Sequence, residues 1–244
     1  MIISKSVHFS GCLTAGLALL AVGCGRSGGY TPEPVTPPEP VVRKVGEEEK
    51  LMPLIEGSRW TYELETVSFA DDKELGNNTQ TLVFEVKRSS DTSTGRRASL
   101  ELLLDDNAID RQQWLVTNQG IFQVSVGLDN SVFSPIQPVL RFPATEGSKF
   151  SWTGIGICPD GTVGKSTADS IVLPAQKADS QMGVFAAVPV ESKIKFSSKV
   201  SGVATNTTWF RPNVGIVRLR QEVFIGNRRS VTTLRLKNYS LKQS

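Results

Sequence analysis

The sequence predicts an all-β protein, a strongly curved antiparallel sheet that forms a half-barrel or open barrel of roughly ten to twelve strands. Short runs in which apolar and polar residues alternate recur along the chain, and helical periodicity is hard to find. In the run VESKIKFSSKV, Val190, Ile194 and Phe196 point to one side of a strand. Glu191 and Lys193 point to the other side, which is typical of an antiparallel sheet with one solvated face.

Turn signals between these runs are the second observation. The dipeptide Gly226-Asn227 puts glycine first, as a type II′ two-residue hairpin requires. The turn at Pro159–Gly161 combines a proline that presets φ, an aspartate that hydrogen-bonds its own backbone, and a glycine suited to the left-handed region. Residues 118–120 carry a similar signal. We expect strands at about 58–69, 80–88, 97–104, 111–117, 120–127, 147–157, 162–173, 185–199, 205–211, 215–225 and 228–239, and a helical turn near Asp105–Asp110.

One ten-residue pattern occurs twice, as PLIEGSRWTY at Pro53–Tyr62 and as PATEGSKFSW at Pro143–Trp152. In each copy a proline-led turn ends at a glycine, Gly57 or Gly147, and a strand follows. Each strand starts with aromatic residues at alternate positions: Trp60 and Tyr62, Phe150 and Trp152. Because residues two apart share a face of a strand, each copy places an aromatic pair on one side of the sheet. We interpret the repeat as two similar sheet halves; the alternative is an aromatic platform for a ligand.

The N-terminal residues 1–23 have the features of a secretory signal peptide, with one lysine, an apolar run from Leu13 and small residues at the end. The apolar run is too short for a transmembrane helix, which needs about 20 residues. Ala21–Cys24 resembles the lipobox of bacterial lipoproteins. This resemblance implies cleavage before Cys24, whose sulfur then carries a diacylglycerol and whose amine carries an acyl chain such as palmitate. The alternative is an ordinary secretory signal with an incidental cysteine.

Residues 24–50 are expected to be the lipidated cysteine and a disordered tether rich in proline and glutamate. In polyproline II geometry, at about 3.1 Å per residue, the tether holds a domain up to roughly 80 Å from its lipid. Residues 51–244 are expected to form a single β domain. Gly25 follows the lipidated position, and the lack of an aspartate there indicates the outer membrane, with the domain in the periplasm.

Composition argues against several functions. The 27 basic and 24 acidic residues are scattered, so the chain lacks the basic patch expected of a nucleic-acid-binding protein. The one histidine, His8, lies in the expected signal peptide, so none remains for Ser-His-Asp or Cys-His catalysis or for a His-ligated metal. We therefore expect a protein that is not an enzyme and uses no metal or cofactor. Cys158 is expected to be a buried, inert thiol; a reactive thiol is the alternative.

Three pairs of acidic or amide residues lie in polar, turn-like stretches: Asp71-Asp72, Asp105-Asp106 and Asp129-Asn130. We expect these pairs to be solvated turn tips, because Asp and Asn are favoured in turns. A calcium site or a glycosidase carboxylate pair is the functional alternative. A carboxylate-only or Ser-Lys enzyme therefore stays open beside the non-catalytic interpretation.

The repeat also carries a family resemblance. Pro53–Tyr62 is similar to the Pro-Leu-x-x-Gly-x-x-Trp-x-Tyr opening strand of an uncharacterised family of bacterial exported proteins and lipoproteins. Gly183–Val190 is similar to the family's Gly-x-Phe-x-Ala-x-x-Val strand, Trp209–Val217 to its Trp-aromatic-x-Pro-x-Val-Gly closing motif, and Leu234–Leu241 to its final strand. In shape the family resembles the half-barrels of periplasmic lipoprotein carriers. The resemblance implies an antiparallel sheet around a largely apolar interior and transfers no catalytic residue.

The leading functional hypothesis is a membrane-anchored, non-catalytic binding module that holds a lipid, an acyl chain or a partner segment in the concave face of the sheet. The second is a structural or interaction lipoprotein whose interior is packed by its own side chains. Cavity volume separates the two, because ligand pockets typically measure about 300–1,000 Å³. A transmembrane β-barrel is the third hypothesis, and the lipobox, the proline-rich tether and the polar residues Lys242–Ser244 argue against it.

Overall fold

In a computed structural model of the chain, residues 46 and 48–242 are described, and their strands form one antiparallel sheet. The expected signal peptide at 1–23, the anchor residue Cys24 and the tether up to residue 45 lie outside the described residues. A short 3-10 helix, η1 (Glu48–Leu51), precedes the first strand. Within the described part of the chain, no helix is long and apolar enough to cross a membrane.

The strands follow the alternating runs of the sequence. They are β1 (Arg59–Ala70), β2 (Lys73–Thr92), β3 (Gly95–Leu104), β4 (Asn107–Thr117), β5 (Gly120–Val126), β6 (Ser131–Arg141), β7 (Lys149–Ile157), β8 (Val163–Val172), β9 (Gln176–Ser180), β10 (Gly183–Ser197), β11 (Ser201–Arg211), β12 (Gly215–Ile225) and β13 (Arg228–Ser240).

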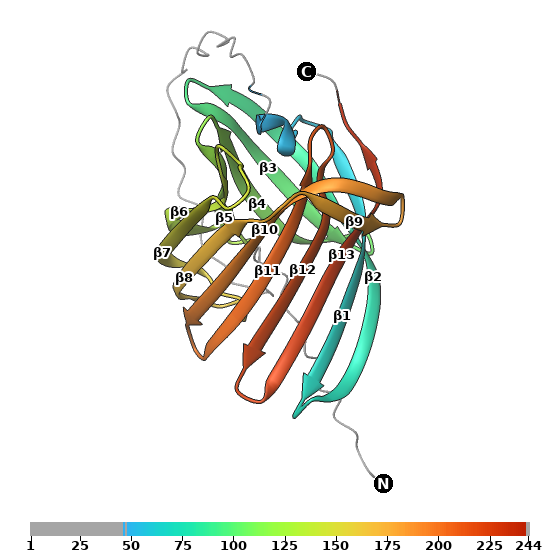
Figure 1. The fold of residues 1–244 in the computed structure, drawn as a ribbon, viewed down its shortest axis with the longest axis vertical. Helices are drawn as coiled ribbons and strands as arrows, with labels where there is room; N and C mark the ends of the chain where they lie inside the picture. The colour runs from blue at the N-terminus through green and yellow to red at the C-terminus, as the bar shows by residue number, and fades with distance from the viewer. Residues whose placement is uncertain (1–45, 47, 243–244) are drawn as a thin grey trace, which may run out of the picture.

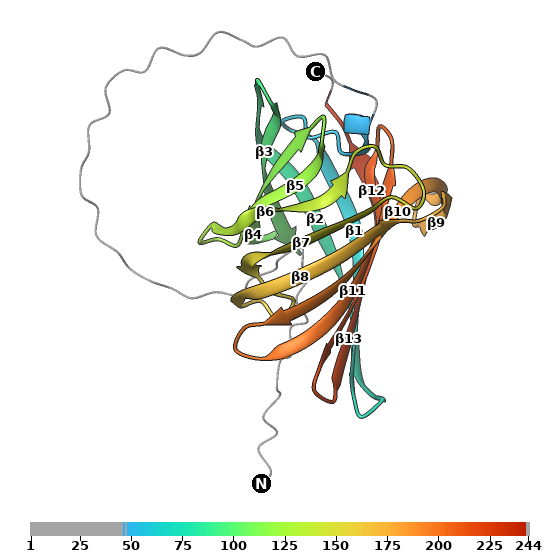
Figure 2. The ribbon, with the colours of Figure 1, turned by 60° about the vertical axis from the view of Figure 1, so that its left-hand side comes forward.

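Consecutive strands pair around a ring, so the sheet is a meander that closes into a barrel (Figure 1, Figure 2). β9 stands apart from the ring: it pairs with the first residues of β10, and β8 pairs with the rest of β10. β13 returns to β1, and twelve residue pairs, from Arg59↔Ser240 to Ala70↔Arg228, join the two ends of the sheet. The predicted all-β, strongly curved antiparallel sheet is confirmed, and its two edges meet to give a closed barrel.

Two strands and one turn depart from the expected elements. β6 was not expected; it contains Pro135 and Pro138, and proline cannot donate to a ladder. β9 is a five-residue, polar strand with no apolar alternation to signal it. The helical turn expected near Asp105–Asp110 is wrong. Instead Asp105 and Asp106 form the turn of the β3–β4 hairpin, with φ of 46° and 65°, which no right-handed helix accommodates.

The turns predicted from glycine are confirmed. Gly226 has φ of 59°, and Ile225 pairs with Arg228 directly across the two-residue turn. In the β7–β8 turn, Gly161 has φ of 80° and the N–H of Thr162 donates to the Asp160 carboxylate at 3.1 Å. Each turn therefore uses the residue chemistry that its sequence indicated.

The ten-residue repeat opens two equivalent halves of the barrel. Gly57 and Gly147 have φ of 79° and 81°. Their N–H groups donate to the carbonyl oxygens of Val86 and Val172, each at 2.8 Å, on the strand that follows. In both copies the N–H of the same valine donates to the carbonyl of the serine that follows the glycine, at 2.9 Å. One half of the ring is β1 to β6, and the other is β7, β8 and β10 to β13.

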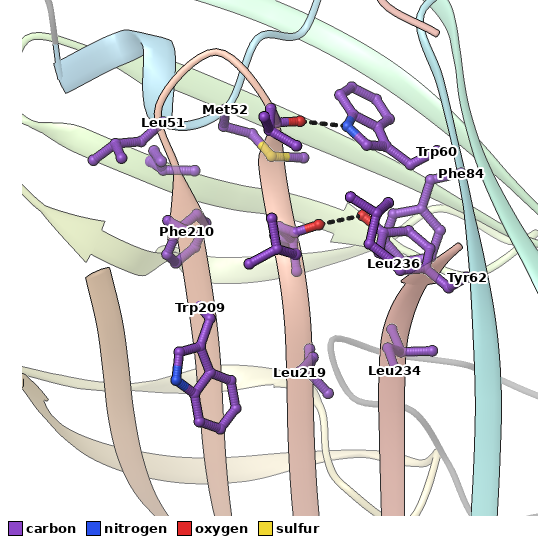
Figure 3. Packing of buried hydrophobic residues seen from close by; sticks show 14 of the residues in the cluster. Leu51, Met52, Trp60, Tyr62, Phe84, Trp209, Phe210, Leu219, Leu234 and Leu236 are labelled. Carbon is purple, nitrogen blue, oxygen red and sulfur yellow. Dashed lines mark hydrogen bonds between the residues drawn. The ribbon is translucent and has the colours of Figure 1, made fainter. Parts of the chain in front are cut away.

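The larger of two buried clusters includes the start of β1 (Figure 3), and the smaller one includes Phe133 and Trp152. Trp60 and Tyr62 are both 0% exposed, and their polar atoms have partners. The indole of Trp60 donates to the carbonyl of Val214, and the phenol of Tyr62 donates to the carbonyl of Ile216 at 2.9 Å. Burial raises the pKa of the Tyr62 phenol. The aromatic pair of the first repeat is therefore core and not a ligand platform.

Candidate functional site

A small cavity of about 70 Å³ lies in the barrel interior. Its lining is mixed, with Ser170 and Ser192 hydrogen-bonded at 2.8 Å, and with the Oδ1 of Asn206 lacking a hydrogen-bond partner in the part of the chain described. A buried water needs roughly 10–15 Å³ of such space, so the cavity has room for a few waters. It is well below the roughly 300–1,000 Å³ of a typical ligand pocket. The interior thus favours a core packed by its own side chains.

A buried polar network runs along the inner face of β4. The carboxylate of Asp110 is 0% exposed and accepts hydrogen bonds from the N–H of Gly127 at 2.6 Å and the amide of Gln112 at 2.9 Å. The Gln112 carbonyl in turn accepts from Trp114 Nε1 at 2.9 Å and from the Gln123 amide at 3.1 Å. Desolvation outweighs these hydrogen bonds and raises the pKa of Asp110 to about 6. The network satisfies its own groups and leaves the carboxylate no access to solvent.

The two junctions between the barrel halves differ in their pairing. β1 and β13 pair over the whole length of β1. At the other junction, between β6 and β7, the register of the described residues holds a single pair, Ser134↔Ile155. β6 carries Pro135 and Pro138 just beyond this pair, and neither can donate an N–H. We call this junction, from Ser131–Arg141 to Lys149–Ile157, the seam.

The edge of β7 that faces the seam has one registered pair, at Ile155. Val172 N–H donates to the carbonyl of Ser148, and Cys158 N–H donates to the carbonyl of Thr162. In an antiparallel ladder such bonded pairs alternate, so even-numbered residues of β7 bond to β8. The N–H and C=O groups of Lys149, Ser151 and Thr153 therefore point toward β6, at positions where the register records no partner.

Two aromatic side chains fill the seam from the inside. The rings of Phe133 and Trp152 meet edge to face, with centroids 6.0 Å apart. Phe133 lies over Gly156 and Trp152 over Gly154, where any Cβ would come within 2.4 Å of a ring carbon. Trp152 Nε1 also donates to the carbonyl of Pro135 at 3.0 Å. Phe133 and Trp152 thus pack across the seam, and glycine is required where their rings lie.

On the outside, the seam opens into a cleft of about 450 Å³. Its apolar lining consists of Leu115, Phe122, Pro135, Ile136, Pro138 and Trp152, with Ser, Thr and Gln side chains at the rim. Among the lining residues that the structure describes, Arg141 carries the one charge. Its guanidinium lies 4.8 Å from the centre of the Phe122 ring. We call this space the seam cleft; Trp152 and Pro138 line both it and the interior cavity.

A larger surface hollow of about 830 Å³ lies over β2, β3 and β4. Three of its charged residues form ion pairs: Glu101 lies 3.4 Å from Lys87 and 3.5 Å from Arg111. The hollow is open and polar, and its lining holds four cations and two carboxylates. Of these two concavities, the seam cleft is the one whose apolar lining suits a small ligand.

Of the residues singled out from sequence, Trp152 lines the seam cleft, while the acidic pairs and Cys158 lie apart from it. Asp71-Asp72 and Asp105-Asp106 are solvent-exposed hairpin turns with positive φ, and Asn130 has φ of 58° in the β5–β6 turn. No cluster of three metal-ligating residues occurs among the described residues. Cys158 is 0% exposed, 3.3 Å from the Ser166 hydroxyl, and burial raises the pKa of its thiol. The expected burial of Cys158 is confirmed, and Cys24 lies outside the described residues.

Sequence reasoning missed the seam cleft. Its signals were present: two prolines in SPIQP that weaken β6, and two glycines in TGIGI that replace the large residues expected on an inward face. The prolines and glycines indicate a cleft only if β6 and β7 are neighbours, which the sequence does not show. The repeat also aligns Gly154 with Leu64, so the second half of the barrel has a glycine where the first half has a leucine.

By sequence, no known protein family matches the chain, and none of the curated proteins does. Three solved structures are similar in shape. A candidate lipoprotein from Parabacteroides distasonis is 13% identical, with 78% of this chain and 98% of that chain covered and a TM-score of 0.47. A candidate exported protein with a YmcC-like fold from Bacteroides fragilis is 15% identical, with the same coverages and a TM-score of 0.42. The hypothetical lipoprotein YmcC from Escherichia coli is 12% identical, with 80% and 90% covered and a TM-score of 0.39. Similarity at this level carries no information on what the present chain binds or does.

Proposed function

We propose that this protein is a lipoprotein of the bacterial cell envelope that acts as a non-catalytic binding module. It is anchored through Cys24 to the outer membrane, with the barrel in the periplasm, and it holds its ligand in the seam cleft. The observation that carries the proposal is the seam cleft itself: about 450 Å³, apolar walls and one cation, beside an interior cavity of only about 70 Å³. Lipid, acyl chain and partner segment, the ligand classes considered from sequence, all suit such a cleft in chemistry.

The chemistry of the seam cleft supports binding more than catalysis. Its polar groups are hydroxyls, amides and the guanidinium of Arg141, and no carboxylate or imidazole stands among the described lining residues. General acid–base catalysis needs a group that titrates near the working pH within reach of the substrate. The buried carboxylate with a raised pKa, Asp110, is held by Gly127 and Gln112 and lies outside the cleft lining.

The second candidate function is a structural or interaction lipoprotein with a packed interior. The small volume of the interior cavity is the observation that favours it. The two candidates share the lipid anchor and differ in whether the seam cleft is occupied by a ligand in the cell.

The anchor is tested by the variant Cys24→Ala in the full chain. We expect this variant to move from the membrane pellet to the soluble fraction, because stable anchoring needs more than one acyl chain and a protein without Cys24 has no attachment point for any. Unchanged membrane retention, measured by fractionation and immunoblotting, would refute the lipid anchor.

The ligand is tested by native mass spectrometry of residues 25–244, exported to the periplasm and gently purified, with lipid extraction of the same sample. We expect a stoichiometric adduct that is lost in Ile136→Glu, which places a charge in the seam cleft. The matched control is Val163→Glu, an exposed aliphatic residue on β8 outside the cleft, which should keep the adduct. An adduct that survives Ile136→Glu would place the ligand elsewhere, and a bare polypeptide would favour the packed structural lipoprotein.

A further inference from the structure

β1 is the counterpart of β7 in the other half of the barrel, and the strand that pairs with β1 indicates what the seam edge of β7 can bind. The repeat aligns β7 with β1 at an offset of ninety residues, since Pro53–Tyr62 corresponds to Pro143–Trp152. The glycine and serine of each copy make the same hydrogen bonds to the following strand, so the two strands leave their turns in the same way. Lys149, Ser151 and Thr153 of β7 therefore correspond to Arg59, Thr61 and Glu63 of β1.

On β1 this edge is fully used. Arg59 pairs with Ser240, Thr61 with Asn238 and Glu63 with Arg235, all on β13, which runs antiparallel to β1. β13 is the last strand of the ring and reaches this edge with its C-terminal end. The same edge of β7 has no registered strand pair over about 14 Å, four steps of about 3.4 Å from Lys149 to Thr153.

We propose that the seam cleft receives the C-terminal segment of another polypeptide as an added strand, antiparallel to β7, with its terminal carboxylate beside Arg141. This inference rests on the proposed binding function and names the partner of that site. The edge groups of Lys149, Ser151 and Thr153 supply backbone hydrogen bonds, which is how strand addition gains affinity. A segment held in this way completes at β7 the pairing that β13 completes at β1.

The chemistry of the seam cleft matches such a segment. The side chains of a strand alternate between two faces, so every second residue of the segment turns toward the apolar wall formed by Leu115, Phe122 and Ile136. An antiparallel segment ends near Lys149, where β7 begins. Arg141, at the end of β6, lies at that same end of the seam and has no carboxylate partner among the cleft residues described. A terminal carboxylate supplies the missing anion through charge-assisted hydrogen bonds.

The experiment uses two synthetic probes, the N-acetylated hexapeptide Thr-Val-Thr-Val-Thr-Val with a free C-terminal carboxylate and the same peptide with a C-terminal amide. Residues 25–244, labelled with ¹⁵N, are titrated with each probe, and amide hydrogen exchange is followed by NMR. We expect exchange to slow at Ser151 and Thr153, whose N–H groups become bonded, and at no amide that already bonds to β8. The amidated peptide should bind roughly tenfold more weakly, because it lacks the charge-assisted bond to Arg141.

Variants of one residue separate strand addition from a general effect on the fold. Thr153→Pro removes an N–H that points into the seam and leaves pairing with β8 intact, so it should abolish binding of both peptides while thermal unfolding stays close to that of the parent chain. Thr153→Ala keeps the N–H and should bind the acid peptide within about twofold of the parent. Arg141→Gln should remove the difference between the acid and amide peptides, and it serves as the test even where Thr153→Pro does not fold.

Each remaining outcome decides between the inference and the proposed function. Failure of both peptides to slow exchange at Ser151 and Thr153 at millimolar concentration overturns strand addition. Binding of dodecanoate that depends on Ile136 and leaves those two amides unprotected also overturns it and assigns the seam cleft to an acyl chain, which keeps the binding module. With no peptide, no dodecanoate and no adduct bound in the seam cleft, both the inference and the binding module fail.

Discussion

The indole Nε1 of Trp152 donates a hydrogen bond to the carbonyl oxygen of Pro135 at 3.0 Å. This bond connects β7 to β6 next to the single backbone pair of the seam, Ser134↔Ile155. At the other junction, backbone hydrogen bonds of the ladder hold β1 and β13 together; at the seam, this side-chain bond helps to hold β6 and β7 together. The side chain that closes the barrel at the seam is thus also one that lines the seam cleft.

Trp152→Phe should therefore loosen the seam more than the rest of the barrel. The variant keeps an aromatic ring beside Phe133 but leaves the Pro135 carbonyl without its donor, so we expect a loss of about 1–2 kcal/mol in the free energy of unfolding. Amide exchange should accelerate at residues 149–155 before it does elsewhere.

The matched control is Trp209→Phe. Trp209 is 9% exposed, close to the exposure of Trp152, but its Nε1 has no hydrogen-bond partner within the described chain. The substitution there removes no bond and should cost less. Equal losses in urea unfolding, with no local change in amide exchange, would mean that the Trp152 bond does not hold the seam.

Trp60→Ala should be among the most damaging single substitutions in the barrel. Trp60 is fully buried, and its removal leaves a large cavity at the end of the barrel where η1 and the β11–β12 turn meet. Large aromatic-to-alanine changes in a core cost about 3–5 kcal/mol. Trp60→Phe should cost less, since it keeps most of the volume and loses the hydrogen bond to Val214. Urea denaturation of the two variants checks the order, and a near-neutral Trp60→Ala would contradict the core assignment.

The predictions from sequence succeeded where the cause of a structure is local. Alternation along residues 215–225 depends on one strand with one buried face, and β12 has those bounds. The repeat predicted two equivalent starts because Gly57 and Gly147 need positive φ whatever the rest of the chain does. Asp105-Asp106 shows the limit of local reasoning: the leucine run before it favoured a helical turn, and cross-strand pairing of β3 with β4 decided for a hairpin.

What sequence reasoning missed depends on contacts between distant segments. Closure of the barrel rests on pairs such as Arg59↔Ser240, and nothing near either residue encodes its partner. The seam cleft draws its walls from β4, β5, β6 and β7, so its volume follows from their arrangement. Gly154 and Gly156 have their explanation in the rings of Trp152 and Phe133, which lie over them.

Gly147→Ala should separate the cost of backbone conformation from the cost of crowding. Gly147 has φ of 81°, and an added Cβ meets no atom within 4 Å, so strain in the left-handed region is the one expected penalty. That strain costs about 1–2 kcal/mol for a residue with a Cβ. Gly76→Ala is the control, because its added Cβ is equally free and its φ lies outside the positive region. We expect Gly76→Ala to change the free energy of unfolding by less than about 0.5 kcal/mol. Similar losses at both positions would show that φ does not dictate glycine in the repeat.

Asp110 should make the stability of the barrel depend on pH between about pH 4 and pH 6. Burial raises its pKa from 3.8 to about 6 in the folded state, so across this window the folded protein holds a proton that the unfolded chain has released. The stabilisation from the protonated group is therefore fully present below pH 4 and is lost as the pH rises toward 6. The free energy of unfolding falls by about 3 kcal/mol over this window and does not change further above it.

The variant Asp110→Asn isolates this effect. Its single side-chain oxygen can accept from Gly127 but no longer also from Gln112, so we expect a pH-independent loss of about 1 kcal/mol. The difference in unfolding free energy between parent and variant therefore reports the titration of Asp110. Urea unfolding at half-unit steps from pH 3.5 to 7.5 should show the parent losing stability relative to the variant as pH rises. A constant difference across that range would mean that Asp110 ionises in the barrel as it does in water.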